Sequence, residues 1–221
     1  MLNESSVEEQ KEELSMITCK LAALSGAVRE TFIRRKTLPG DDLVKRLHDL
    51  IEEIAFTAVR VDEQMTGKPL RSRKPLLIYQ STLTHLHIIT ATMVKLVEEL
   101  QKELEDGISF PETDIAQADN LFTQQEMILC TLEEAIRSGD ERHLRAVYRA
   151  CGELIRICRH SATEHEKCVE QGLCLPGAAL SFLTILDLMR LLGHHELETV
   201  KLLIRWKGKS RAVPADLSHG R

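Results

Sequence analysis

Apolar residues recur every three or four positions along most of the chain, which is the spacing of one face of an α-helix. Turn residues interrupt the pattern and leave six predicted helices, over residues 5–36, 41–65, 75–105, 113–138, 140–171 and 176–206. Capping signals support several of the starts: Ser5 and Ser6 each precede a glutamate by three residues, and Asp140 directly follows a Ser-Gly break. No segment shows the alternation expected of a β-strand.

The last predicted helix is apolar on nearly every face, whereas a surface helix carries one apolar stripe and a broad polar face. Its large apolar residues are Phe182, Leu183, Ile185, Leu186, Leu188, Met189, Leu191 and Leu192. With Pro176, Asp187 and Arg190, the segment has fewer uncharged residues than the roughly 20 of a membrane span. We therefore expect a buried central helix, and we expect any special chemistry at its polar segment, residues 193–196 (Gly-His-His-Glu).

The clearest break in the pattern runs from Glu105 to Asp114, where Gly107 suits a helix end and Pro111 a new start. It separates two sets of three helices. The predicted fold is therefore all-α, with six helices in two tandem antiparallel three-helix bundles, or in one fused bundle. We expect a first repeat over residues 1–108, a second over 109–206, and a disordered basic tail over 207–221.

Composition and motifs argue against several classes of function. The chain of 221 residues has a formal net charge of −5, which argues against nucleic-acid binding because phosphate backbones require a basic face. Its N-terminus is acidic where a signal peptide is basic and then apolar, so we expect a cytoplasmic protein. It has no G-x-S-x-G, H-E-x-x-H or glycine-rich phosphate loop, and we expect no enzymatic activity.

Two groups of residues are candidates for binding. Lys68, Arg71, Arg73 and Lys74 lie in a predicted basic loop that could contact an anion or an acidic partner, although such a run is more often a solvated connection. The cysteines form no C-x-x-C pair, and we expect buried reduced thiols in preference to a metal site. They are Cys19, Cys130, Cys151, Cys158, Cys168 and Cys174.

Residues 159–179 (RHSATEHEKCVEQGLCLPGAA) resemble the PhoU family, and most of all the PhoU-type domain attached to bacterial sodium/phosphate cotransporters. In that domain a Gly-x-Cys turn leads into a last helix of the form L-E-R-I-G-D-H, and residues 188–194 here are LMRLLGH. The resemblance implies a PhoU-like regulatory or interaction module linked to phosphate transport or phosphate signalling. It implies a dimer that contacts a phosphate transporter or its signalling proteins at the inner face of the membrane.

This chain departs from the family at the metal motifs. Metal-binding members carry acids at helix positions i and i+4, which places two carboxylates on one face. The matching residues are Met189 and Gly193 in the second half, and His87 and Ala91 in the first. Since neither half keeps a carboxylate pair, we expect no metal cluster of the family type and no cofactor.

Histidines provide an alternative hypothesis, a metal-binding helical bundle that uses His87, His194 and His195. His85 and His87 form an H-x-H on the third helix. Side chains one or two positions apart diverge on a helix, so a zinc site would need both helices to meet. Surface or hydrogen-bonded histidines are the simpler interpretation. A structural helical adaptor with an unrelated partner is the third hypothesis.

Overall fold

The computed structural model describes residues 4–34, 40–172 and 175–207. These residues form long helices joined by short turns, and they include no strand. The helices are α1 (Glu4–Arg34), α2 (Gly40–Met65), α3 (Leu70–Glu105), α4 (Glu112–Ser138), α5 (Glu141–Glu170) and α6 (Pro176–Lys207). The prediction of an all-α fold with six helices is confirmed.

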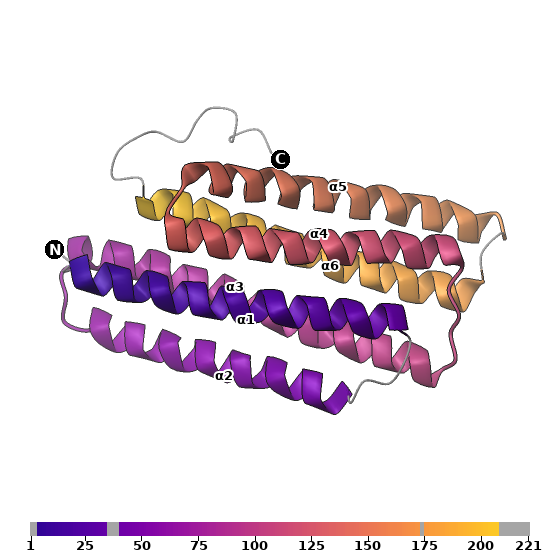
Figure 1. The fold of residues 1–221 in the computed structure, drawn as a ribbon, viewed down its shortest axis with the longest axis horizontal. Coiled ribbons are helices and arrows are strands. Elements are labelled where there is room, and N and C mark those ends of the chain that lie inside the picture. Colours follow the sequence, from indigo (N-terminus) through magenta and orange to yellow (C-terminus); the bar gives the residue numbers. More distant parts are fainter. Residues whose placement is uncertain (1–3, 35–39, 173–174, 208–221) are drawn as a thin grey trace.

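The helices form one elongated bundle (Figure 1). α1 and α4 lie side by side across the middle of the view, α3 and α6 lie behind them, and α2 and α5 flank the four on opposite sides. Each set of three helices packs together, and the two sets join where α1 contacts α4 and α3 contacts α6. The buried apolar residues of both sets form one hydrophobic core.

α6 occupies the central position that its apolar sequence predicts. It packs against α3, α4 and α5, and Phe182, Ile185 and Met189 are fully buried. By length and composition it is the one helix in the described part of the chain that could cross a membrane, and 50% of its apolar window is buried within the bundle. Leu191 is exposed, so the helix is covered on most faces rather than all of them.

The prediction of a basic loop ahead of α3 was wrong. The helix begins at Leu70, before Pro75, and Pro69 takes the extended N-cap position with φ −65° and ψ 151°. Pro75 is the sixth residue of the helix, where a proline removes only one intrahelical hydrogen bond. Gly67 and Pro69, which precede Leu70, are residues that favour a turn before a helix start. Residues 70–74 are therefore helical, and of the predicted loop only Lys68 and Pro69 belong to the connection between the two helices.

Other predicted helix boundaries agree closely with the structure. Asp140 caps α5 by accepting a hydrogen bond from the backbone N–H of Arg142 at 2.8 Å. Gly172, predicted to end a helix in the left-handed conformation, has a φ of 67°. α6 includes Lys207, the first residue of the predicted tail, whereas residues 208–221 lie outside the described part of the chain. The division into two sequence repeats at residue 108 stays a prediction.

The cysteine prediction was only partly right. Cys151 and Cys158 are buried free thiols, but Cys19 and Cys130 are free and exposed. Cys168 is disulfide-bonded, and Cys174 lies outside the described residues. The reason for the first difference is geometric: Cys19 and Cys130 lie on the outer edge of their helices rather than on the apolar stripe.

Candidate functional site

The polar segment of α6 brings one of its histidines against α3. His195 Nδ1 lies 2.9 Å from His85 Nδ1, and the two ring centroids are 5.2 Å apart. Both side chains are half-buried. One Nδ1 must donate a proton and the other accept it, so the contact requires at least one neutral ring. The pair lies at the joint between the two halves of the bundle.

Burial lowers the pKa of both histidines. For His195 the positive charges of His85 and His194 add to this effect, while Glu198 opposes it. Glu198 likewise opposes the lowering of the His85 pKa by burial. The fold therefore favours neutral rings in this contact near neutral pH.

The structure tests which of the candidate histidines meet. His85 and His195 come together, which the sequence alone does not reveal, whereas His87 and His194 take no part in their hydrogen bond. The described residues contain no group of three or more His, Cys, Asp or Glu side chains arranged to hold a metal ion. His85 and His195 are therefore hydrogen-bonded to each other, and a metal ion at this position would need ligands beyond these two side chains.

Next to His195, the side chain of Glu196 points into the core and is completely buried. Gln125 on α4, itself buried, donates a hydrogen bond from Nε2 to Glu196 Oε1. Burial raises the pKa of Glu196 well above the ordinary range, and the hydrogen bond from Gln125 opposes this only in part. Burial is the larger effect, so the fold favours the neutral carboxylic acid form of Glu196 over the carboxylate.

Two oxygens of this pair show why a proton belongs there. Glu196 Oε2 and Gln125 Oε1 are buried without a hydrogen-bond partner among the described atoms. An ionised carboxylate contributes only acceptors, whereas a protonated one contributes an O–H donor. A proton on the Glu196 carboxyl group would add a second donor to this pair, beside the Nε2–H of Gln125, and a buried acceptor left unsatisfied is costly.

The face of α6 that would carry the family's acids is apolar. Met189 is fully buried, and Gly193 lies so close to α5 that a Cβ there would be 3.1 Å from Ile155 Cγ1 and 3.4 Å from Leu154 Cδ2. A carboxylate at this position would be buried without a partner. The residues present on this face therefore do not fit a carboxylate-bound metal ion.

A second polar cluster, which is partly buried and which the sequence pattern did not predict, joins the first three helices. Glu13 of α1 accepts hydrogen bonds from Tyr79 Oη at 2.6 Å, Thr57 Oγ1 at 3.0 Å and Arg60 Nη1 at 3.3 Å. Burial, together with the hydrogen bond to Glu13, raises the pKa of Tyr79. The available signal was the place of Glu13 four residues before Ile17, beside the apolar stripe of α1.

The predicted basic contact residues lie at the start of α3. Arg73 Nε donates to the carbonyl oxygen of Lys68, which folds the arginine back over the turn, and Lys74 is exposed. The side chain of Arg71 lies outside the described part of the structure. Their role in partner binding stays a prediction.

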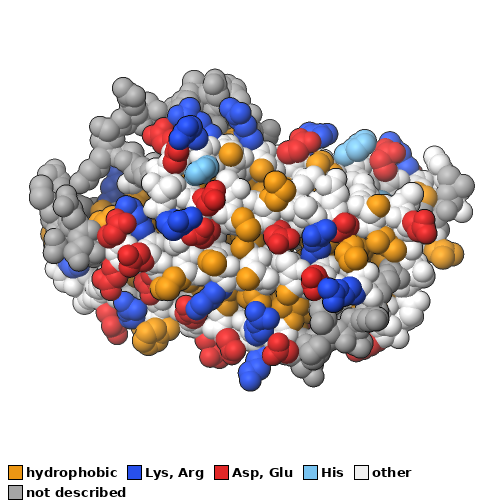
Figure 2. Space-filling view, viewed as in Figure 1, with side chains coloured by type: hydrophobic (Ala, Val, Ile, Leu, Met, Phe, Trp, Pro, Cys, Tyr) orange, Lys and Arg blue, Asp and Glu red, His pale blue; other side chains and the backbone are white. Residues whose placement is uncertain are grey.

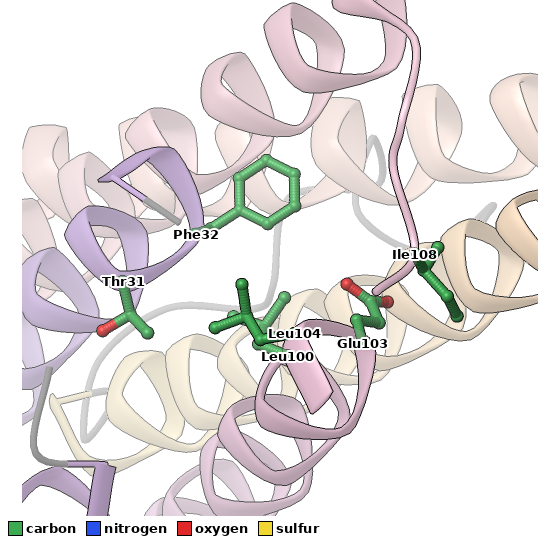
Figure 3. A pocket seen from close by; sticks show the side chains of 6 residues that line it. All are labelled: Thr31, Phe32, Leu100, Glu103, Leu104 and Ile108. Carbon is green, nitrogen blue, oxygen red and sulfur yellow. The ribbon is translucent and has the colours of Figure 1, made fainter. Parts of the chain in front are cut away.

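Two pockets among the described residues are small or apolar. The pocket in Figure 3, between Phe32, Leu100 and Ile108, has a volume of only about 10 Å³. A second, apolar pocket of about 150 Å³ lies between Ile136, Leu203 and Trp206. On the face in Figure 2, acidic and basic side chains are interspersed, and neither sign gathers into a large patch.

The fold and its contacts define a class of protein, a bundle of six long helices in which two antiparallel three-helix sets share one core. Two solved structures have this fold. The phosphate transport system regulatory protein PhoU from Streptococcus pneumoniae superposes with a TM-score of 0.79 at 8% sequence identity, covering 94% of this chain and 98% of that one. PhoU from Pseudomonas aeruginosa gives a TM-score of 0.75 at 13% identity, covering 91% and 97%.

No protein-family model matches the sequence, and no curated protein matches it either. At these identities the likeness concerns the fold. The PhoU-like resemblance that residues 159–179 indicate is therefore confirmed as a PhoU-like fold over nearly the whole chain.

Proposed function

We propose that this protein is a non-enzymatic regulatory module of the PhoU type, acting in the control of phosphate transport or phosphate signalling. One observation carries the proposal: the likeness to the S. pneumoniae regulator extends over 94% of this chain and 98% of that protein. The two proteins therefore share their whole architecture rather than one helical hairpin. The proposal treats the protein as an interaction module whose long helices present surfaces to a partner.

The proposed partner is a phosphate transporter or one of its signalling proteins, bound at the cytoplasmic face of the membrane by a dimer of this chain. Lys68, Arg71, Arg73 and Lys74 are the proposed contacts. They gather four positive charges at the turn between α2 and α3 and the first turns of α3, and such a segment favours an acidic partner surface.

Affinity capture with the tagged full chain tests this proposal. From detergent extracts of the source cell, the chain should recover a phosphate transporter or its sensor kinase. Replacing Lys68, Arg71, Arg73 and Lys74 by Ala should lower the recovery at least several-fold. A control variant removes four exposed positive charges from α5 instead, at Arg145, Arg149, Arg156 and Lys167.

The outcomes are distinct. If the two charge variants bind equally well, the basic segment is not the contact. If the wild-type chain recovers neither partner, and deleting its gene leaves phosphate-dependent growth and gene expression unchanged, the proposed function is wrong.

A second proposed function, the metal binding suggested by His87, His194 and His195, rests on the approach of His195 to His85. Two imidazole nitrogens on a tetrahedral zinc ion, each about 2.0–2.1 Å from the metal, lie about 3.3 Å apart, and His85 Nδ1 and His195 Nδ1 are 2.9 Å apart. Elemental analysis of the purified protein tests it. A content well below one metal ion per chain, unchanged in the His85→Ala and His195→Ala variants, would exclude metal binding at this pair.

A further inference from the structure

Two exposed, free cysteines lie on neighbouring helices of different halves of the bundle. Cys19 belongs to α1 and Cys130 to α4. These two helices pack along their length and run side by side in Figure 1. Exposure makes both thiols accessible to a reagent in solution, unlike the buried Cys151 and Cys158.

Flanking contacts place the two cysteines opposite each other. On one side, Ser15 Oγ donates to Glu133 Oε1 at 2.7 Å. On the other, a Cβ on Gly26 would lie 3.1 Å from Glu126 Oε1. From the first contact to the second, the residue number rises on α1 and falls on α4, so the two helices are antiparallel. Cys19 and Cys130 both lie between these two contacts.

Helical spacing puts both cysteines on the same edge of the α1–α4 seam. Cys19 follows Ser15 by four positions and precedes Gly26 by seven, and Cys130 precedes Glu133 by three and follows Glu126 by four. Residues three, four or seven positions apart share a helix face. Since packed helix axes lie about 8–10 Å apart and Cα atoms about 2.3 Å from each axis, facing residues approach the Cα separation of about 4.4–6.8 Å that a disulfide requires.

The electrostatics of Cys130 agree with this placement. Three effects raise the pKa of Cys130: burial is the largest, the charge of Glu126 is the second, and the charge of the Cys19 thiolate is the third. The two thiols are thus close enough for the ionised form of one to disfavour ionisation of the other.

We propose that Cys19 and Cys130 are a reversible modification site, a dithiol that forms an intramolecular disulfide by exchange with a low-molecular-weight disulfide such as oxidised glutathione. The Cys19 thiolate attacks one sulfur of the reagent, the reagent's S–S bond breaks, and one thiol leaves. The Cys130 thiolate then attacks the mixed disulfide at the Cys19 sulfur, and the second thiol leaves. The protein loses two protons and two electrons, and the reagent gains them as two thiols.

This disulfide would join the first half of the bundle to the second. It closes the chain between residues 19 and 130, which includes α2 and α3 entirely. The other free cysteines in the described part of the chain are protected because they are buried: burial raises the pKa of Cys158 to about 12 and that of Cys151 even further. Oxidation is therefore expected at one pair of thiols, with a site-specific product.

The full chain, purified without reductant, is incubated with oxidised glutathione, alkylated, digested with trypsin and analysed by mass spectrometry. The expected product is one cross-link between peptides 12–20 and 103–137, formed within single chains at a yield independent of protein concentration. Cys19→Ser and Cys130→Ser should each abolish it, and Cys158→Ser should leave it unchanged. The oxidised protein should unfold at a higher urea concentration than the reduced one.

Two results would overturn the proposal. One is glutathione attached to Cys19 and Cys130 separately, with no link between them. The other is a Cys19–Cys130 link formed only between two chains, with a yield that rises with protein concentration. Circular dichroism of each serine variant verifies that it is folded, and both positions are exposed.

Discussion

Glu196 should make the protein less stable as the pH rises above the ordinary range of a glutamate. The side chain is completely buried, and burial raises its pKa in the folded state. In the unfolded chain the pKa returns to about 4.3. Between these two values the folded protein holds a proton that the unfolded chain has released, so unfolding releases a proton and becomes more favourable as the pH increases.

The size of the effect follows from this difference of one proton. The free energy of unfolding should fall by about 1.4 kcal/mol for each pH unit inside the window, or about 2.7 kcal/mol over two units. The stabilising contribution of the proton is complete below about pH 4.3 and is lost as the pH rises through the folded-state pKa. Such a loss is a large fraction of the roughly 5–15 kcal/mol by which native proteins are stable.

Glu196→Gln is the informative variant. Its amide keeps an acceptor for Gln125 Nε2 and has an N–H donor in place of the carboxylic O–H, but it has no proton to lose in this range. Urea unfolding followed by circular dichroism between about pH 5 and about pH 8 gives the difference in stability between wild type and variant. Taking this difference cancels the titration of all other groups that the substitution leaves unaltered.

The difference should change with pH in favour of the variant. Glu166→Gln makes the same chemical change at an exposed position of α5 and serves as the matched control, for which the difference should stay flat. A flat difference for Glu196→Gln as well would refute the argument, because it would mean that burial does not hold the proton on Glu196.

Three further predictions concern the packing and charge of the bundle. Gly193→Asp, which places the acid of the PhoU-type motif on α6, should cost more than about 3 kcal/mol in urea unfolding because it buries an unpaired carboxylate. Gly193→Ala, whose Cβ would lie 3.1 Å from Ile155 Cγ1, should cost less, and equal costs would contradict this. Burial lowers the pKa of His85 and His195 in the folded protein, so the unfolded chain takes up protons first as the pH falls. The free energy of unfolding should therefore decrease as the pH drops below about 6.5, and NMR titration midpoints of these histidines above that value would contradict the prediction. Tyr79→Phe should cost about 1.5–3 kcal/mol by removing a buried hydrogen bond to a carboxylate, and an unchanged urea midpoint would argue against that bond.

Most of the fold could be predicted from the sequence because each helix carries its own signal. The spacing of apolar residues in α1 and their presence on nearly every face of α6 are local properties of the sequence, and both predicted the observed burial. The start of α3 could not be fixed in the same way. Pro69 and Pro75 both suit a helix start, and the choice between them depends on how the chain leaves α2.

The candidate site was predictable only in part, for a different reason. The polar segment at residues 193–196 indicated where special chemistry would lie, and the buried Glu196 is there. The contact between His85 and His195 joins residues 110 positions apart. It depends on the register of α3 against α6, which no pattern within either helix contains. Glu13 was missed because a polar residue beside an apolar stripe is usually solvated.

The proposed role in phosphate regulation is tested most directly in the cell that makes this protein. The measurement is the expression of phosphate-starvation genes, and the uptake of phosphate, in wild-type and deletion strains grown with ample phosphate. A PhoU-type regulator predicts that deletion alters both, and that the full chain supplied in trans restores them. Identical expression and uptake in the two strains would contradict the proposed function.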